Sequence, residues 1–219
     1  MDAVLEYNAK QVIVCDCDPV DCVQSWLLAG NWYELDLLQM LDKLQICGNY
    51  LDIGAYVGTF SLFSSLFCPS DNIYAIEPQL DIYSKLVRNI EANNINKCKT
   101  FNIAISDYNG RGQMTHSDTN HGGSRLVAGV EVEVATLDSL QIPNIKVVKI
   151  DVENGELDVL RGGQNTISNA NHLFIEVWPE STCQRYNVPY VGKQVADLLA
   201  SMGFSHQCEL SGDNHYWKK

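Results

Sequence analysis

A glycine-containing turn near residue 54 is the clearest sign of chemistry in the chain. Asp52, Gly54 and Gly58 have the spacing Asp-x-Gly-x-x-x-Gly after a short apolar run, and a helical pattern begins at Thr59. A strand that turns directly into a helix presents backbone N–H groups and the positive end of the helix dipole to a bound anion. The Gly-x-Gly-x-x-Gly fingerprint that seats a dinucleotide pyrophosphate is absent from this stretch. We therefore expect a ligand carboxylate here, and a cationic group held by Asp52.

S-adenosylmethionine carries a carboxylate, a positive centre and a ribose, so it fits this pattern. Glu77 ends the next expected strand, where a carboxylate can accept hydrogen bonds from both ribose hydroxyls. Ile103 and Ala104 lie at the end of the third expected strand and could flank the adenine, although apolar packing explains them equally well. The alternatives are an ordinary strand–turn–helix and a solvent-exposed acid at a strand end.

Three more acids follow two later strands. Asp151 and Glu153 come at the end of one apolar run, and Glu176 comes at the end of the next. Ligands of open α/β sheets bind beyond the carboxyl ends of the strands, so these acids should meet at that edge. Gathered carboxylates repel one another unless a cation or other partners compensate them. A sulfonium would supply one positive charge.

Alternating strands and helices are expected to position these residues. Strands are predicted over residues 49–53, 72–77, 98–105, 146–152 and 172–178. Helices are predicted between them and over residues 195–202. A turn at residues 211–214 predicts a final hairpin that adds an antiparallel strand. The fold class is therefore α/β, a Rossmann-like three-layer sandwich with a mostly parallel sheet.

Residues 1–47 are expected to form an N-terminal helical cap segment, and residues 48–219 the main domain. A short strand is predicted at residues 11–15, and apolar residues at helical spacing predict a helix over 37–44. Glu34, near the start of that helix, is placed to reach a ligand. Residues 116–129 are polar and glycine-rich, a loop long enough to suspect a function, and His121 and Ser124 are candidates for contact with an acceptor.

Composition limits the partners. The formal net charge of −12 disfavours nucleic acid and anionic membranes, and no apolar run or signal-peptide pattern suggests a membrane or an export route. We therefore expect a soluble, cytoplasmic protein. Its eight cysteines lack zinc-finger spacing and are interpreted as reduced, mostly buried thiols; a metal site at residues 15–22 is a weaker alternative.

Four stretches together resemble the FkbM-type methyltransferases, a branch of the class I S-adenosylmethionine-dependent enzymes. They are Asp52-Ile53-Gly54-Ala55 with Gly58, Ile76-Glu77-Pro78, Ala104-Ile105-Ser106-Asp107 with Gly110, and Lys149-Ile150-Asp151-Val152-Glu153 with Glu156 and Leu160-Arg161-Gly162. The resemblance runs from about residue 32 to residue 178. Two positions depart from it: Tyr56 stands where the family usually has Asn, and Asn154 where it usually has Gly.

This resemblance implies a seven-stranded sheet with the last strand antiparallel. It implies O-methylation, commonly of sugar hydroxyls in glycans or natural products, with S-adenosyl-L-methionine as cofactor. The residues assigned to cofactor binding are Glu34, Asp52, Gly54, Ala55, Tyr56, Gly58, Thr59, Glu77, Pro78, Ile103, Ala104 and Asp151. The catalytic candidates are Asp151, Glu153 and Glu176, and the acceptor candidates are His121 and Ser124.

The expected reaction is an in-line displacement at the cofactor methyl group, with a carboxylate as base. We assign no metal ligand, although Asp151, Glu153 and Glu176 would together suit Mg²⁺. The expected partner is a small-molecule or glycan acceptor, and a homodimer is left open. Alternatives are a cofactor-binding module without turnover, a methyltransferase acting on a non-sugar small molecule, and a nucleotide-dependent oxidoreductase.

Overall fold

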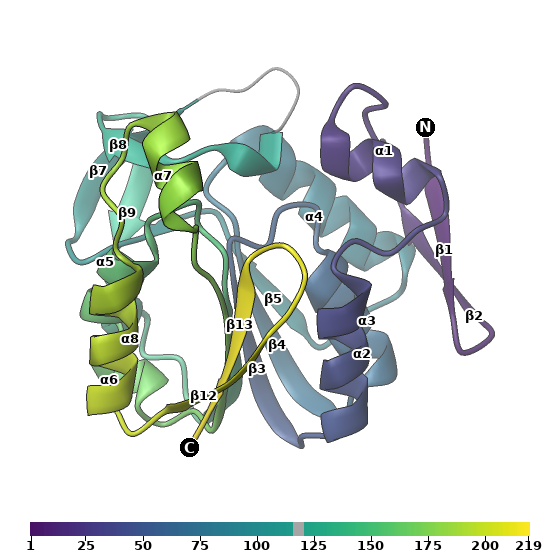
Figure 1. The fold of residues 1–219 in the computed structure, drawn as a ribbon. Helices are drawn as coiled ribbons and strands as arrows, with labels where there is room; N and C mark the ends of the chain where they lie inside the picture. The colour runs from purple at the N-terminus through teal and green to yellow at the C-terminus, as the bar shows by residue number, and fades with distance from the viewer. Residues whose placement is uncertain (116–120) are drawn as a thin grey trace.

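The computed structural model describes residues 1–115 and 121–219, and its centre is a seven-stranded sheet (Figure 1). The strands follow the order β12-β13-β11-β10-β3-β4-β5 across the sheet. Their bounds are β3 Gly48–Ile53, β4 Ser70–Ile76, β5 Cys98–Phe101, β10 Ile145–Ile150, β11 His172–Glu176, β12 Ser205–Glu209 and β13 Asn214–Lys218. From β3 the chain continues to β4 and β5 on one side of the sheet, and from β10 it continues to β11 on the other side. A ligand is expected at this reversal of strand order, beyond the carboxyl ends of β3 and β10.

The parallel strands are short apolar runs because both faces of the sheet are covered. β3 pairs with β10 and β4, and Leu51 lies opposite both Val148 and Tyr74. β13 runs antiparallel to β11, with Tyr216 opposite Phe174. The Rossmann-like α/β fold and its antiparallel last strand are therefore confirmed.

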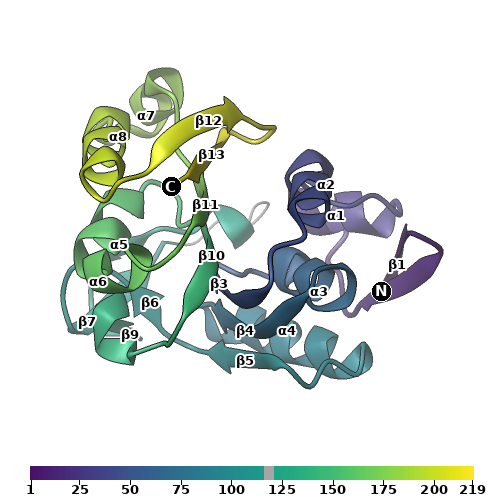
Figure 2. The same ribbon diagram turned by 90° about the horizontal axis from the view of Figure 1, so that it is seen from below.

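Helices cover both faces of the sheet and make a three-layer sandwich (Figure 2). Their bounds are α1 Cys22–Leu28, α2 Leu35–Leu44, α3 Thr59–Phe67, α4 Leu80–Ala92, α5 Glu156–Gly162, α6 Gln164–Ile167, α7 Glu180–Tyr186 and α8 Gly192–Ser201. Phe63 of α3 and Leu86 of α4 belong to one buried cluster, and Leu160 of α5 and Leu199 of α8 belong to another. Each face of the sheet therefore has its own core.

The N-terminal segment, residues 1–47, contains a β-hairpin as well as helices. β1 (Ala3–Tyr7) pairs antiparallel with β2 (Lys10–Val14), and α1 and α2 follow. Burial alternates along β1, as in a half-buried strand, although the sequence interpretation placed no strand there. Leu5 and Val12 pack in the same buried cluster as α3 and α4. The division of the chain at residue 47 stays a prediction.

The single strand expected over residues 98–105 is wrong, because the chain forms two strands in two sheets. β5 ends at Phe101, whereas β6 (Ala104–Ile105) joins a four-stranded sheet with the order β6-β9-β7-β8. The other bounds in that sheet are β7 Gly110–Met114, β8 Leu126–Ala128 and β9 Val132–Ala135. Between β5 and β6, the Asn102 side chain donates to the carbonyl oxygens of Glu77 and Pro78. This ties the break in the strand to the end of β4.

The cysteines are all free thiols, as expected, but only Cys17, Cys68 and Cys183 are buried. The expectation of mostly buried thiols is therefore wrong. Across the two described ranges, no helix has the length and apolar character needed to cross a membrane.

Candidate active site at the carboxyl edge of the sheet

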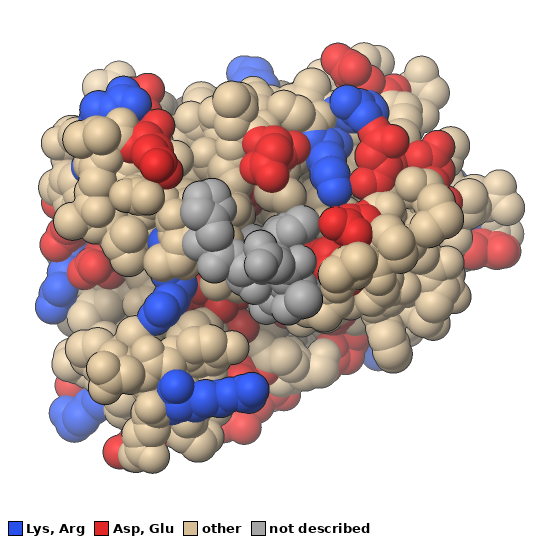
Figure 3. Space-filling view, turned by 90° about the horizontal axis from the view of Figure 1, so that it is seen from above, with Lys and Arg blue, Asp and Glu red and all other residues tan. Residues whose placement is uncertain are grey.

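A cleft lies over the carboxyl ends of the central strands and encloses about 1070 Å³ including its mouth. Its walls come from the N-terminal segment, the turn after β3, the ends of β4, β10 and β11, and the chain before β8. Figure 3 looks onto this face, where acidic side chains are spread around the centre and isolated basic side chains lie between them. Among the described residues, six acids and one lysine line the cleft, so its lining is acidic.

The turn after β3 is shaped by glycines and by internal hydrogen bonds. A Cβ added at Gly54 (φ +81°) would lie 1.7 Å from the carbonyl oxygen of Asp151, so only glycine fits between β3 and β10. The amides of Gly54 and Ala55 donate to the Ile76 carbonyl, and the Gly58 amide donates to Ala55. The amides of Gly54, Ala55 and Gly58, which we expected to be free for an anion, are therefore already used within the protein.

Asp52 is a buried carboxylate with one free oxygen. Its Oδ2 accepts a hydrogen bond of 2.6 Å from the Ser61 hydroxyl, whereas its Oδ1 has no partner among the described residues. Burial raises the pKa of Asp52 to about 6, against the opposing effects of Lys149 and Ser61. A buried acceptor without a partner is costly unless a ligand donates to it. Asp52 therefore suits a ligand ammonium group.

Glu77 connects the end of β4 to the turn. Its two carboxylate oxygens accept from the amide of Tyr56 at 3.0 Å and from the amide of Gln79 at 2.9 Å. The side chain is buried, and burial raises its pKa to about 7 against the lowering effect of these amides. Each carboxylate oxygen keeps a further lone pair for a ligand hydroxyl.

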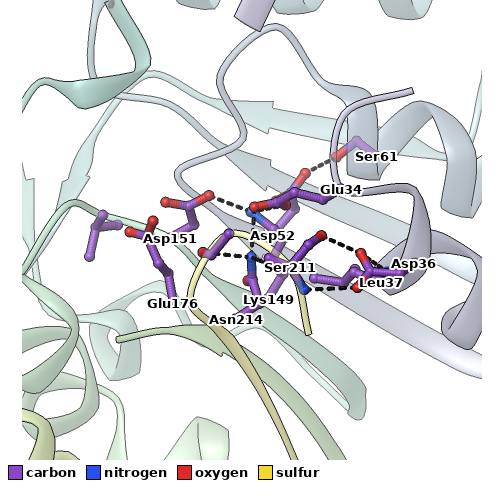
Figure 4. A network of polar contacts seen from close by, with 12 residues as sticks. Glu34, Asp36, Leu37, Asp52, Ser61, Lys149, Asp151, Glu176, Ser211 and Asn214 are labelled. Atoms are coloured by element: carbon purple, nitrogen blue, oxygen red, sulfur yellow. Dashed lines mark hydrogen bonds and ion pairs between the residues drawn. The ribbon is translucent and has the colours of Figure 1, made fainter. Parts of the chain in front are cut away.

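Lys149 is a buried cation at the centre of a polar network (Figure 4). Its Nζ lies 2.7 Å from Asp151 Oδ2 and 3.7 Å from Glu34 Oε2. Burial alone would lower the pKa of Lys149, but Asp151, Glu34 and Asp52 together outweigh burial and raise it. Glu34 also accepts from Asn214 at 2.6 Å, which ties the N-terminal segment to the last hairpin. Lys149 therefore stays charged and compensates part of the acidic edge.

Glu153 and Glu176 carry the remaining carboxylates of the edge. One carboxylate oxygen each from Asp151, Glu153 and Glu176 lie within 4.8 Å of one another. Burial, and then repulsion from Asp151, raise the pKa of both Glu153 and Glu176. Trp178 Nε1 donates to Glu176 at 3.1 Å, whereas Glu153 has no hydrogen-bond donor among the described side chains. These acids can hold protons or, in the ionised form, a divalent cation.

Most of the expected site residues meet in this cleft. The residues that line it are Glu34, Asp52, Gly54, Ala55, Tyr56, Thr59, Glu77, Pro78, Ile103, Ala104, Ser124, Asp151, Glu153 and Glu176. Gly58 does not line it, because it starts α3 and faces Leu86 of α4. The side chain of His121 lies outside the described residues. So does the whole of His116, a second histidine of the polar, glycine-rich stretch and a weaker candidate for the base.

Sequence reasoning missed several lining residues, among them Lys149 and Tyr33. A lysine in an expected strand is normally predicted to be exposed, so Lys149 was not assigned to the site. Tyr33 stands next to Glu34, and burial raises the pKa of its hydroxyl, with Glu34 and Asp151 adding to the effect. The available signal for Lys149 was its position two residues before the strand-end acid Asp151. No local pattern in the sequence marked Tyr33.

The model of the methyltransferase FkbM domain matches residues 52–205, most of the chain. Methyltransferase 1 of Beauveria bassiana is 28% identical over 141 residues, which cover 51% of this chain and 57% of that protein. The hexuronic acid methyltransferase AglP of Haloferax volcanii is 26% identical over 163 residues, which cover 69% of this chain and 65% of that protein. The chain thus spans less than two thirds of either relative.

Among solved structures, methyltransferase FkbM from Methylobacillus flagellatus KT superposes with a TM-score of 0.56 at 14% identity. The superposition covers 90% of this chain and 52% of that one. At this identity the likeness is one of fold.

Proposed function

Because the chain belongs to the methyltransferase FkbM family, we propose that it transfers a methyl group from S-adenosylmethionine to a sugar hydroxyl. The observation that carries this proposal is Asp52, a buried carboxylate in the wall of the cleft with an unpartnered oxygen. The ammonium group of the methionine moiety has the charge and the hydrogen-bond donors that this oxygen lacks. The printed name of the Haloferax relative supports a sugar as the acceptor.

The other residues of the cleft fit the remaining parts of the cofactor. Glu77, Ile103 and Ala104 line the cleft, which supports Glu77 as the acceptor of the ribose hydroxyls and the two apolar residues as neighbours of the adenine. The excess of carboxylates over Lys149 suits a ligand with both an ammonium and a sulfonium group. When bound, S-adenosylmethionine supplies a methyl group made electrophilic by its positively charged sulfur.

Glu153 is the best-placed base for the acceptor hydroxyl. Its carboxylate is not held by a hydrogen bond from any described residue, whereas Asp151 is bound to Lys149 and Glu176 to Trp178. Burial and the neighbouring Asp151 raise the pKa of Glu153 to about 9, so its ionised form is a strong base, and that form requires bound positive charge or a higher pH. Its backbone has a φ of +59°, a strained conformation of the kind that concentrates at functional sites. Glu153 would therefore take the proton as the hydroxyl oxygen attacks the methyl carbon.

A divalent cation at Asp151, Glu153 and Glu176 is the alternative use of these acids. Mg²⁺ prefers such oxygen ligands and would lower the pKa of a bound hydroxyl. Turnover measured before and after treatment with a chelator distinguishes the two. An unchanged rate would exclude a required metal, and a rate restored only by added Mg²⁺ would establish it.

The central experiment incubates the protein with methyl-labelled S-adenosylmethionine and a panel of glycosides matched with non-sugar alcohols. We expect label in the glycosides. Glu153→Gln should reduce transfer by at least about 100-fold, the scale of general base catalysis, and leave cofactor affinity unchanged. Absence of cofactor binding in calorimetry would overturn the proposal. Binding of the cofactor without transfer to any acceptor would identify a cofactor-binding module without turnover. Label in the non-sugar alcohols alone would show that the acceptor is not a sugar.

A further inference from the structure

A cation and two aromatic rings flank the acidic end of the cleft. Arg125 follows Ser124, which lines the cleft; Trp178 lies just after β11, and Tyr186 ends α7. The guanidinium carbon of Arg125 lies 5.9 Å from the centre of the Trp178 ring and 5.8 Å from that of the Tyr186 ring. The two ring centres are 5.1 Å apart. The ring planes are tilted by 35° to one another, and the three side chains form one cation–aromatic group.

One hydrogen bond and one electrostatic effect connect this group to the candidate catalytic acids. Trp178 donates a hydrogen bond to Glu176 Oε2, and Glu176 lines the cleft. The positive charge of Arg125 also acts on Glu153: burial, Asp151 and Glu156 raise the pKa of Glu153, while Lys149 and Arg125 lower it. None of the three side chains lines the cleft itself, so the group adjoins the candidate catalytic acids through the hydrogen bond of Trp178 to Glu176.

The hydrogen-bonding capacity of Arg125 is unused in the part of the chain that the structure describes. Its guanidinium makes only the two ring contacts there, whereas Arg111 donates to two carbonyl oxygens and Arg161 pairs with Asp158. A guanidinium has five N–H donors in a planar fork, which matches the two oxygens of a carboxylate. The contacts with the two rings restrict the movement of the guanidinium.

The charge of the cleft gives this arrangement a chemical meaning. Its carboxylates would repel an anionic acceptor, and Arg125 places a positive charge with free donors at their border. Tyr186 is 49% exposed, so it offers an open ring surface beside the guanidinium. Aromatic rings combine an apolar face with a polar edge, which suits a sugar ring.

We propose that Arg125, Trp178 and Tyr186 form an acceptor subsite for a sugar that bears a carboxylate, with Arg125 paired to that carboxylate and Tyr186 against the sugar ring. The subsite rests on the proposed methyltransferase function and adds the acceptor's charge class. Arg125 binds the acceptor in this arrangement and takes no part in proton transfer.

The test compares 4-nitrophenyl β-D-glucuronide with 4-nitrophenyl β-D-glucoside, which differ only at C6, a carboxylate in the first and a hydroxymethyl group in the second. With labelled S-adenosylmethionine, we expect the unaltered protein to have at least about a ten-fold higher kcat/KM for the glucuronide. Arg125→Gln should lose about 10- to 100-fold with the glucuronide, mostly through KM, and change less than about three-fold with the glucoside. Arg125→Lys should fall between, since a lysine keeps the charge without the fork.

Arg185→Gln is the matched control. Arg185 is exposed and its guanidinium carbon also lies 5.8 Å from the centre of the Tyr186 ring, so the substitution removes the same charge beside the same ring. It should leave the preference for the glucuronide unchanged. Calorimetry with S-adenosylmethionine on the unaltered protein and on Arg125→Gln should give equal affinities.

Three outcomes would overturn the subsite. The first is an unaltered protein that prefers the glucoside or shows no preference. The second is an equal loss of kcat/KM with both glycosides in Arg125→Gln. The third is no methyl transfer to either glycoside. An equal loss would mean that Arg125 acts through Glu153. In each case the proposed function survives if S-adenosylmethionine binds and another acceptor is methylated. A protein that does not bind S-adenosylmethionine would remove both proposals.

Discussion

Glu77 accepts a hydrogen bond from the Tyr56 amide, which holds the turn, and in the proposed function the same carboxylate accepts the ribose hydroxyls. Replacing Glu77 by Gln turns one acceptor into a donor, so one ribose hydroxyl and one backbone amide lose their partner. The loss of hydrogen bonds to a charged group corresponds to about 1.5–3 kcal/mol, or roughly 10- to 100-fold weaker binding of S-adenosylmethionine.

Calorimetry measures this change in affinity. Glu91→Gln removes an equivalent charge from an exposed position on α4 and should bind the cofactor like the unaltered protein. An affinity of Glu77→Gln within two-fold of the control would mean that Glu77 supports the turn and does not touch the ribose.

Tyr56 and Asn154 show why the two departures from the family pattern are tolerated. Both residues have positive φ, +52° and +73°, a region in which asparagine and glycine are the least strained. Asn154 therefore replaces a glycine at little cost. Tyr56 is less suited, but its hydroxyl accepts a hydrogen bond from the buried Gln24 of α1, and its amide is held by Glu77.

We expect Tyr56→Phe to destabilise the fold by about 1–3 kcal/mol, because the buried amide of Gln24 loses its acceptor. The turn should loosen with it, so the affinity for S-adenosylmethionine should fall. Urea unfolding and calorimetry measure the two effects. Tyr83→Phe deletes the same atom from a contact with Thr100 on another part of the sheet, and should lower stability without changing cofactor affinity.

The last hairpin is hydrogen-bonded to the N-terminal segment. The backbone amide and the hydroxyl of Ser211, in the turn between β12 and β13, both donate to Asp36 in the first turn of α2. These hydrogen bonds keep the pKa of Asp36 below its usual value, although burial acts in the opposite direction. The contact lies next to Glu34, so it helps to fix one wall of the cleft.

Asp36→Ala should lower the free energy of unfolding by about 1–2 kcal/mol, through the lost hydrogen bonds to a charged group. In a domain of this size, that is a decrease in Tm of roughly 2–8 °C. Differential scanning calorimetry measures it. As a control, Asp197→Ala breaks an exposed ion pair on α8 and should leave the Tm unchanged. Equal Tm values for the two variants would show that the contact with Ser211 contributes nothing to stability.

Elements with strong local patterns could be predicted from the sequence, and elements without them could not. The apolar runs of β3, β4 and β10 and the turn at Gly54 gave the sheet edge and most of the site. α7 was missed because Cys183 is its only buried residue, so no apolar periodicity marks it. The break between β5 and β6 depends on the contact of Asn102 with the end of β4, which no local pattern contains.

Site residues follow the same division. Asp52 and Glu77 stand at strand ends beside a glycine turn, so their position could be inferred. The burial of Lys149 depends on Glu34 and Asp52, which come from distant parts of the chain, and Arg125 meets Trp178 and Tyr186 only in the fold. Such long-range contacts leave no pattern in a short stretch of sequence, so the properties that depend on them could not be predicted.

For the whole molecule, the buried acids make stability depend on pH. The pKa values of Asp52, Glu77 and Glu156 are raised by burial to about 6, 7 and 7, above their values near 4 in an unfolded chain. Between those limits the folded protein binds more protons than the unfolded one, so stability is lost as pH rises. Without ligand, the Tm should therefore fall between about pH 5 and pH 8.

S-adenosylmethionine should reverse part of this loss, because its cationic groups favour ionised carboxylates. Its stabilising effect on Tm should grow over the same pH range, and its binding should release protons. Calorimetry in two buffers of different ionisation enthalpy measures that release. Proton uptake on binding, or a Tm that rises steadily to pH 8, would contradict this account of the acids.

The contact of Asn214 with Glu34 joins residues 180 positions apart, and both side chains stand beside the cleft or in its wall. During synthesis, a ribosome must release nearly the whole of this chain before that wall can close. A nascent chain that has made only the first strands of the sheet should therefore have no affinity for the methyl donor. Ligand capture would then report that translation of the hairpin is complete.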